Sequence, residues 1–460
     1  MSEIENRYEN IPSHFEPPPD YKTVCIRDLE TDEKLVMTPI RGEMRAIAQR
    51  QARSRAKNRQ LRLFLQICGF LFFIFLLGIF IWFGFTTSDS EGKTASPPDP
   101  YCQKRVIGYY HGMEDRMITE KQIEKLTHII FDGVRFYENG TIEFRSDSTR
   151  KMFLDMKQKV RFRKPGIKIL LSNDEELVAN LVIMTNAMAT SNSRKKWIDS
   201  IAEFLTTNGI DGVELSWRSH QPADKKFVED FALFIRELRY KFTNMDSSYL
   251  ISVILSNKGF RSETEEDFKT LLDSVDIFNV ATDLYHHAWF NDGKIGSLAP
   301  LYSSKTHSSI DWIMSRYACA LKSPSKLQFT LPFNGASWTN IENLTTSRKS
   351  FFPINAIFDG GFVQYKKIKQ SGFKLSETLY DEEAKSPYIY DEKGGKVLYF
   401  ENERSLMEKV SYMMEKNLGG VTVRRLEYDD NLDTLLNAVS SSMEMCKARE
   451  FENDQVQYKC

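Results

Sequence analysis

Residues 210–218 read Ile-Asp-Gly-Val-Glu-Leu-Ser-Trp-Arg, and they are the most informative segment of the chain for its fold class. An amphipathic helical pattern precedes it and stops at Asn208-Gly209, and within it apolar and polar side chains alternate. Alternation with a period of two predicts a strand, with Glu214, Ser216 and Arg218 on one face. A polar face on an otherwise apolar strand is costly unless it lines a cleft or its charges are paired. We therefore expect these three side chains to line a cleft or to pair within the fold.

Short apolar runs alternate with helical patterns from Arg105 onward, which is the order of elements in a parallel α/β domain. Thr119 and Gln122 have the spacing of a capping box, which predicts the start of a helix. Eight strand–helix units in about 350 residues predict a (β/α)8 TIM barrel, with a functional site at the carboxyl ends of the strands. The candidate strands are residues 105–110, 127–134, 167–171, 212–217, 249–255, 276–281, 327–331 and 420–423.

The predicted strand at 210–218 resembles a strand of the chitinases of glycoside hydrolase family 18. That family carries Asp-Gly-x-Asp-x-Asp-x-Glu on the fourth strand of its barrel, and the aligned positions here are Asp211, Gly212, Glu214, Ser216 and Arg218. Further fragments resemble the family in the family's order, at residues 106–110, 126–131, 275–280, 299–302, 326–333 and 418–421. The resemblance covers most of residues 104–440. It implies a TIM barrel with a small α+β insertion between strands 7 and 8, at about residues 334–398.

The resemblance implies a catalytic mechanism whose residues this chain lacks. In the family the final Glu of the motif is the general acid, and the Asp two positions earlier orients the acetamide that attacks the anomeric carbon. Here these positions are Arg218 and Ser216. Arg218 cannot act as an acid, because a guanidinium keeps its proton throughout the usable pH range. On strand 6 the family's acetamide-binding Tyr and the Asp after it are replaced by Asp283 and Leu284.

The aromatic platforms that hold sugars in the family are also replaced. Met113 after strand 1, Glu176 after strand 3 and Arg424 on strand 8 stand where the family has Trp. The framework motifs survive while the motifs of the cleft do not, so the resemblance implies a fold retained for a role other than hydrolysis. The chain resembles the catalytically degenerate chitinase-like proteins that are abundant in nematodes.

Two arginines at the predicted barrel mouth have alternative interpretations. We expect Arg218 to pair with Glu214 or Asp283 in preference to binding a ligand, because a lone buried charge is strongly unfavourable. Arg424 either binds an anion at the floor of the cleft or forms an ion pair with Asp283, and the sequence favours neither.

Residues 64–85 contain a single strongly polar residue, Gln66, and are long enough to cross the hydrocarbon core of a bilayer as a helix. Arginines dominate the segment before it, and acidic residues outnumber basic ones in the segment after it. This asymmetry places the N-terminus in the cytosol and the rest of the chain outside. The apolar segment begins too late and is too long for a cleavable signal peptide, so we expect a retained signal-anchor.

The predicted organisation is that of a single-pass type II membrane protein with an extracellular or lumenal barrel. We interpret the basic end of the cytosolic tail as a solvated flank that sets the topology, in preference to a helix bound to anionic lipid. Prolines stiffen the stalk. The parts are a largely disordered tail at 1–62, a transmembrane segment at 63–86, a stalk at 87–103, the barrel at 104–445 and a C-terminal tail at 446–460.

Four cysteines lie on the predicted outer side, where disulfides persist: Cys102, Cys319, Cys446 and Cys460. They allow three pairings, and the sequence does not choose among them. We expect at least one bridge, because the first three cysteines should all lie near the N-terminal end of the barrel.

Two sequons also lie on the predicted outer side, beginning at Asn139 and Asn343. We expect glycosylation at Asn139, because it falls in a predicted turn. The cysteines and histidines show no spacing typical of a zinc site, so we expect neither a metal nor a cofactor.

The sequence as a whole predicts a catalytically inactive chitinase-like protein with a binding or signalling role outside the cell. The net charge of −1 gives no reason to expect nucleic acid as a partner. The candidate partners are chitin or another glycan, a protein ligand at the barrel mouth, and the membrane through the chain's own helix. Two alternatives remain: a chitin-binding lectin, and a weakly active chitinase whose acid has moved to Glu214 or Asp283.

Overall fold

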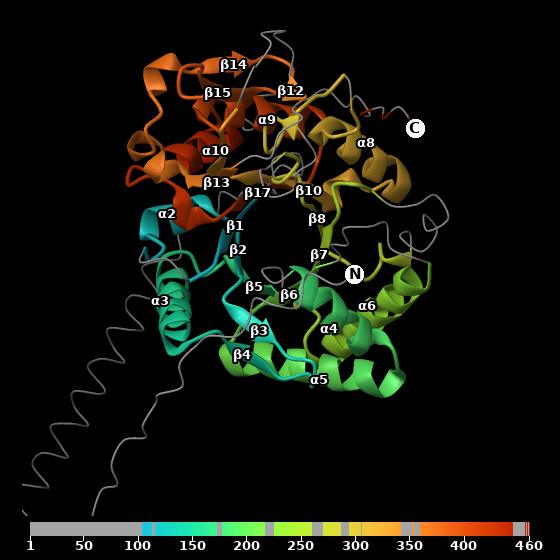
Figure 1. The fold of residues 1–460 in the computed structure, drawn as a ribbon. Helices are drawn as coiled ribbons and strands as arrows, with labels where there is room; N and C mark the ends of the chain where they lie inside the picture. Colours follow the sequence, from blue (N-terminus) through green and yellow to red (C-terminus); the bar gives the residue numbers. More distant parts are fainter. Residues whose placement is uncertain are drawn as a thin grey trace, which may run out of the picture. The chain divides into compact units, whose positions relative to one another are not determined.

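Eight parallel strands close into a barrel in the order β1-β17-β10-β8-β7-β6-β5-β2. The computed structural model describes residues 104–112, 116–172, 177–216, 225–259, 270–286, 294–304, 306–341, 352–353, 359–444, 456, 458 and 460. Each barrel strand overlaps one of the predicted strands, so the predicted TIM barrel is confirmed (Figure 1). The strands are β1 (Arg105–Tyr110), β2 (His128–Phe131), β5 (Lys168–Ser172), β6 (Gly212–Ser216), β7 (Leu250–Leu255), β8 (Ile277–Val280), β10 (Leu327–Pro332) and β17 (Gly420–Arg424).

Helices cover the outside of the barrel, as Figure 1 shows for α3, α5 and α6. Their ends follow local sequence signals. Thr119 and Gln122 form the predicted capping box at the start of α2, and Gly209 ends α5 in the left-handed conformation with φ 57°. The helices are α2 (Glu120–Lys125), α3 (Asp147–Arg163), α4 (Leu177–Met188), α5 (Ser191–Asn208), α6 (Lys225–Met245), α8 (Ile310–Leu321), α9 (Glu403–Glu415) and α10 (Thr434–Glu444).

The two faces of β6 separate as the alternating pattern predicts. Val213 and Leu215 pack outward in the large apolar cluster that the strands share with the helices. Glu214 is fully buried on the opposite face, which looks into the barrel. The apolar part of the barrel interior is a smaller cluster of side chains from several strands. Its buried members are Ile107, Tyr109, Ile130, Leu170, Ile254, Ile277 and Ala281.

The predicted insertion between the last two barrel strands is present as an antiparallel sheet in the order β13-β11-β16-β15-β14. In the described residues of this region, the helical parts are two 3-10 helices, η3 and η4, where the expectation was a small α+β unit. A further short pair, β9 with β12, also forms. The bounds are β9 (Lys294–Ile295), β11 (Asn334–Thr339), β12 (Phe352–Pro353), β13 (Asp359–Gln364), η3 (Tyr365–Gln370), η4 (Leu375–Glu377), β14 (Leu379–Asp381), β15 (Ser386–Asp391) and β16 (Lys396–Tyr399).

A hairpin that the sequence did not predict follows β2. Its strands, β3 (Val134–Phe136) and β4 (Ile142–Phe144), pair antiparallel. The predicted strand at 127–134 merged β2 with the start of β3, and the structure separates the two at Asp132 and Gly133. A side chain at Gly133 would collide with the ring of Phe131, so glycine permits the close approach there.

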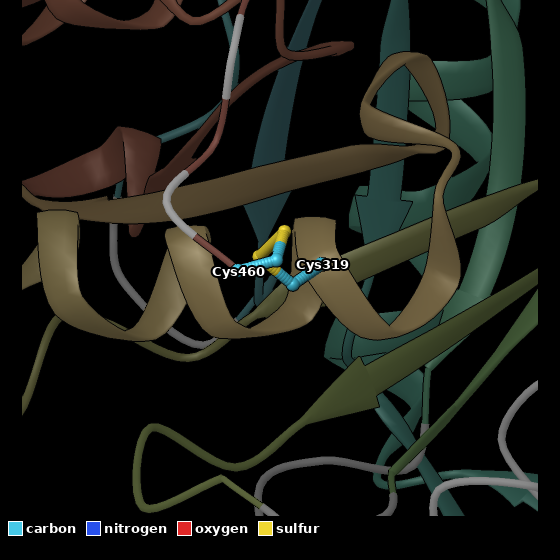
Figure 2. Close-up of a disulfide and its surroundings, with 2 residues drawn as sticks. All are labelled: Cys319 and Cys460. Atoms are coloured by element: carbon cyan, nitrogen blue, oxygen red, sulfur yellow. A yellow bond between two sulfur atoms is a disulfide. The ribbon is translucent and has the colours of Figure 1, made fainter.

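One disulfide joins Cys319, near the end of α8, to Cys460, with the two Cα atoms 5.5 Å apart (Figure 2). The expectation of at least one bridge is confirmed. Near Cys460, the hydroxyl of Tyr458 donates to the carbonyl oxygen of Lys416, just after α9. The end of the predicted C-terminal tail is therefore attached to two helices of the barrel.

Several predicted parts lie outside the described residues: the cytosolic tail, the membrane span at 63–86, the stalk, Cys102 and Cys446. Among the helices that the structure describes, none combines the length and the apolar character that a bilayer crossing requires.

Candidate functional site

Glu214 lies at the centre of a polar network inside the barrel. It is fully buried, and its carboxylate accepts hydrogen bonds from the hydroxyl of Tyr109, from Ser252 Oγ at 2.8 Å and from Asn279 Nδ2 at 3.3 Å. These donors come from β1, β7 and β8, whereas Glu214 belongs to β6. These three donors are neutral side chains.

Tyr109 connects this network to a second one, and sequence reasoning did not identify it as a site residue. Its hydroxyl contacts both Glu214 and Asn279 Nδ2, the latter at 3.2 Å, and its ring lies under the guanidinium of Arg424. The signal that could have found it is the period-two pattern of β1, which places Tyr109 on the inner face of its strand.

Arg424, at the end of β17, forms an ion pair with Asp283. Arg424 Nε lies 3.4 Å from Asp283 Oδ2, and the two side chains are only 12 % and 4 % exposed. Thr330 Oγ1 donates to the other carboxylate oxygen of Asp283 at 2.7 Å. Of the two interpretations that the sequence left open for Arg424, the structure contains the ion pair.

Of the remaining predicted site residues, some lie within the described residues and others do not. Ser216 ends β6 on the same face of the strand as Glu214 and is half-buried. Leu284 packs against an apolar cluster that joins Ile295 of β9 to Trp338 of the insertion sheet. Four further predicted site positions lie outside the described residues: Met113, Glu176, Arg218 and the sequon residue Asn343.

A buried histidine lies between two carboxylates near the ends of β1 and β2, in a cluster that the sequence did not predict. His111 Nε2 is 3.5 Å from Asp132 Oδ2, and its Nδ1 is 3.8 Å from Glu427 Oε2. Burial lowers the pKa of His111, which favours the neutral imidazole. Burial alone would raise the pKa of Glu427, but hydrogen bonds from His111 hold that pKa below its usual value.

A cavity of about 850 Å³ opens on the outer side of the barrel, away from this network. It lies between β4, α3 and α5, and Phe144 and Phe204 contribute aromatic surface to it. None of the predicted catalytic or sugar-platform positions lines it. We therefore place the candidate site at the network of Glu214, Tyr109 and Arg424 inside the barrel.

The part of the chain that the structure describes contains no group of three or more His, Cys, Asp or Glu side chains placed to hold a metal ion.

Comparison with known proteins gives relatives among the chitinases. A putative chitinase 1 from Margaritifera margaritifera is 22 % identical over 315 residues, which cover 66 % of this chain and 66 % of the relative. A probable chitinase 2 from Drosophila melanogaster is 27 % identical over 264 residues, covering 52 % of this chain and 51 % of the relative. The chain thus spans less than two-thirds of the length of each of these relatives.

Solved structures share the fold at low sequence identity. A chitinase-like agglutinin from Robinia pseudoacacia superposes with a TM-score of 0.63 at 22 % identity, covering 73 % of this chain and 99 % of the agglutinin. Human YKL-39, described as a pseudo-chitinase with retained chitooligosaccharide binding properties, gives 0.64 at 19 % identity, covering 74 % of this chain and all of the other (100 %).

The sequence model of the glycosyl hydrolases family 18 matches residues 105–429, which run from the start of β1 to just after β17. This match covers most of the chain and coincides with the closed barrel and its insertion. The chain therefore belongs to glycoside hydrolase family 18, as a chitinase-like member.

Proposed function

We propose that this chain is a catalytically inactive chitinase-like protein that binds a ligand through its barrel. The observation that carries the proposal is the guanidinium of Arg424, which lies over the ring of Tyr109 and pairs with Asp283. In the family resemblance these two positions belong to the sugar platform and to the donor for the substrate acetamide. A fixed guanidinium beside the reacting sugar opposes an oxocarbenium-like transition state, which itself carries positive charge.

A relocated acid is the main alternative, and the contacts of the two candidates argue against it. A general acid needs a proton to give and a path to the leaving oxygen. Glu214 is fully buried and receives hydrogen bonds from Tyr109, Ser252 and Asn279, so its carboxyl group has no open path to a leaving oxygen. Asp283 has both oxygens engaged, one by Arg424 and one by Thr330.

Chitooligosaccharides are the first ligands to test. The agglutinin and YKL-39 have the same fold, and YKL-39 is described as binding chitooligosaccharides without being a chitinase. A chitin-binding lectin is therefore the second candidate function. The lack of an aromatic side chain at positions 113, 176 and 424 weakens it, because such rings stack on the C–H faces of sugars. A protein ligand at the barrel mouth is the remaining alternative.

We also propose that residues 63–86 anchor the protein as a single-pass type II membrane protein with the barrel on the extracellular or lumenal side. The support is the long apolar segment with its basic flank on the N-terminal side. Protease added to intact cells should remove a C-terminal tag and spare an N-terminal tag. The reverse pattern would contradict the proposed topology.

Hydrolysis of a fluorogenic chitotrioside by membranes containing the full chain tests the central proposal. We expect no turnover above that of membranes from cells carrying an empty vector. The matched variants are Glu214→Gln and Asp283→Asn inside the barrel, with Glu203→Gln, an exposed carboxylate on α5, as the control. The proposal would be overturned in favour of a relocated acid if the unmodified chain hydrolyses the substrate, and if either inner variant abolishes this hydrolysis while Glu203→Gln preserves it. A glycan array probed with the same full-length protein in detergent then separates a lectin from a protein-binding barrel.

A further inference from the structure

The hairpin of β3 and β4 ends in a tightly defined loop. Phe136 pairs with Ile142 in the ladder, and the next residue pair closes the loop. The amide of Tyr137 donates to the carbonyl oxygen of Thr141 at 2.9 Å, and the amide of Gly140 donates to the carbonyl oxygen of Tyr137 at 2.9 Å. Gly140 has φ 88°, a conformation that favours glycine. The loop is therefore a three-residue connection with a turn and a glycine bulge, which fixes its geometry.

The side chains at the two sides of this loop face outward. Phe136 and Ile142 are buried, and the ring of Phe136 stacks on Trp197 of α5 with centroids 5.6 Å apart. Alternation along a strand places the next pair, Tyr137 and Thr141, on the opposite face. Tyr137 is 37 % exposed and Thr141 is exposed. An aromatic ring thus stands on the solvent side of the hairpin, at the base of the loop.

Asn139 lies at the centre of the loop, between Tyr137 and Thr141, and is exposed. Its Oδ1 accepts a hydrogen bond from the amide of Thr141 at 2.9 Å. Because the oxygen of the amide makes this contact, the nitrogen of the same amide remains available to solvent. This nitrogen is the atom that N-linked glycosylation modifies, and Asn139-Gly140-Thr141 is an acceptor sequence.

We infer that Asn139 carries an N-linked glycan whose first sugar packs on the ring of Tyr137, so that the glycan stabilises the β3–β4 hairpin. Residues on one face of a hairpin that are diagonal to each other lie within reach of aromatic side chains. A sugar attached at Asn139 projects from the same outer end of the hairpin as Tyr137. Its C–H face covers part of an exposed ring, and this removes apolar surface from water.

The glycan is transferred to Asn139 from a lipid-linked oligosaccharide diphosphate, which is the donor. A bond forms between Asn139 Nδ2 and C1 of the first sugar, and the bond from C1 to the diphosphate oxygen breaks. The lipid diphosphate leaves with the bonding electrons, and the amide nitrogen loses one proton to a base of the transferase. The inference rests on the proposed function, since this donor reaches the barrel only on the lumenal side.

The test uses the full chain, expressed in cells that make only high-mannose glycans. It compares forms of the protein with and without the first sugar on Asn139, and with and without the ring of Tyr137. Mass spectrometry of the peptide containing Asn139 reports occupancy. Endoglycosidase H trims the glycan to its first sugar, and Asn139→Gln removes it entirely. Tyr137→Ser removes the ring, and Tyr240→Ser, an exposed tyrosine on α6, is the matched control.

We expect the Tyr137 and Gly140 amides to exchange hydrogen about fivefold more slowly in the trimmed protein than in Asn139→Gln. The part of this difference that depends on the ring should disappear in the Tyr137→Ser background and persist in the Tyr240→Ser background, which makes a double-mutant cycle for the contact. The part that comes from losing the bond between Asn139 Oδ1 and the Thr141 amide is the same in both backgrounds. An unmodified Asn139, or a glycan whose effect on exchange is the same with and without Tyr137, would overturn the inference.

The topology assay distinguishes failure of this inference from failure of the proposed function. If the C-terminal tag is accessible outside the cell and Asn139 is unmodified, the glycan inference fails and the topology stands. If protease added to sealed microsomes removes the C-terminal tag, that tag is cytosolic, so the topology fails and the glycan at Asn139 is excluded with it.

Discussion

The guanidinium of Arg424 lies over the ring of Tyr109, with Arg424 Cζ 4.4 Å from the ring centroid. The same guanidinium pairs with Asp283, and the hydroxyl of the same tyrosine donates to Glu214. One aromatic ring therefore joins a cation on β17 to a buried carboxylate on β6. Because the members of this network are buried, a change at one of them removes a contact that water cannot easily replace.

Arg424→Ala should lower the free energy of unfolding by about 3 kcal/mol, because it leaves the carboxylate of Asp283 buried without its cation. Urea unfolding of the full chain in detergent measures the loss. Arg404→Ala is the matched control: Arg404 also lies over a tyrosine ring, that of Tyr380, and also pairs with a carboxylate, but its side chain is 51 % exposed. An exposed pair should contribute less than about 1 kcal/mol. Equal losses in the two variants would contradict the buried role of Arg424.

Tyr109→Phe should destabilise the fold by about 1–3 kcal/mol, because Glu214 loses one of its hydrogen-bond donors in a fully buried site. Tyr240→Phe, at a 73 % exposed position, should be neutral. The measurement is again urea unfolding. If both substitutions were neutral, the hydroxyl of Tyr109 would not be holding the carboxylate.

Restoring the family's residues at the degenerate positions should give weak activity at most. Loss of a general acid alone costs about 10²–10⁴ in rate, and residues that act as a unit do not contribute additively. Met113 and Glu176 would still stand at two positions where the family has a Trp that stacks on the sugar. The assay is chitotrioside hydrolysis by the full chain, and turnover comparable to that of an active chitinase would show that the restored positions alone determine activity. The substitutions are Arg218→Glu, Ser216→Asp, Glu214→Asp, Asp283→Tyr, Leu284→Asp and Arg424→Trp.

His128 should make the fold less stable as the pH falls from about 6.5 to about 4. Burial, with Arg105 and Lys168 nearby, lowers its pKa from 6.5 to about 4. Between these values the unfolded chain binds the proton more readily than the folded one, so stability rises with pH and is lost on acidification.

The matched measurement is urea unfolding of the native protein and of His128→Gln at pH 7.5 and pH 5. We expect the native protein to lose about 2 kcal/mol more than the variant between these two pH values. Other histidines, including His111, are present in both proteins, so the difference isolates His128. Parallel losses would show that His128 is protonated equally in the folded and unfolded chains.

The strands of the barrel were predictable because each has its own pattern of apolar residues. Period-two alternation at 210–218 also placed Glu214 on the inner face of β6, and the structure agrees. The length of chain between the last two barrel strands was enough to indicate an insertion. These features depend on local spacing, which a single sequence contains.

The partners of Glu214 were not predictable, because they depend on the register of the closed barrel. Tyr109 is separated from Glu214 by 105 positions and Asn279 by 65. The same holds for His111, whose backbone amide contacts the side chain of Glu427 316 positions away. No local period relates such residues, and only the order in which the strands close brings them together.

The disulfide between Cys319 and Cys460 affects how the protein can be unfolded and degraded. The covalent ring that it closes contains β10, the insertion sheet and β17, the strand that pairs with β1 to complete the barrel. An unfoldase that threads the chain through a narrow pore, from either end, must therefore translocate two segments of the polypeptide side by side when it reaches this ring. Degradation of the barrel by such an unfoldase should therefore require prior reduction of the disulfide, whatever the thermodynamic stability of the fold.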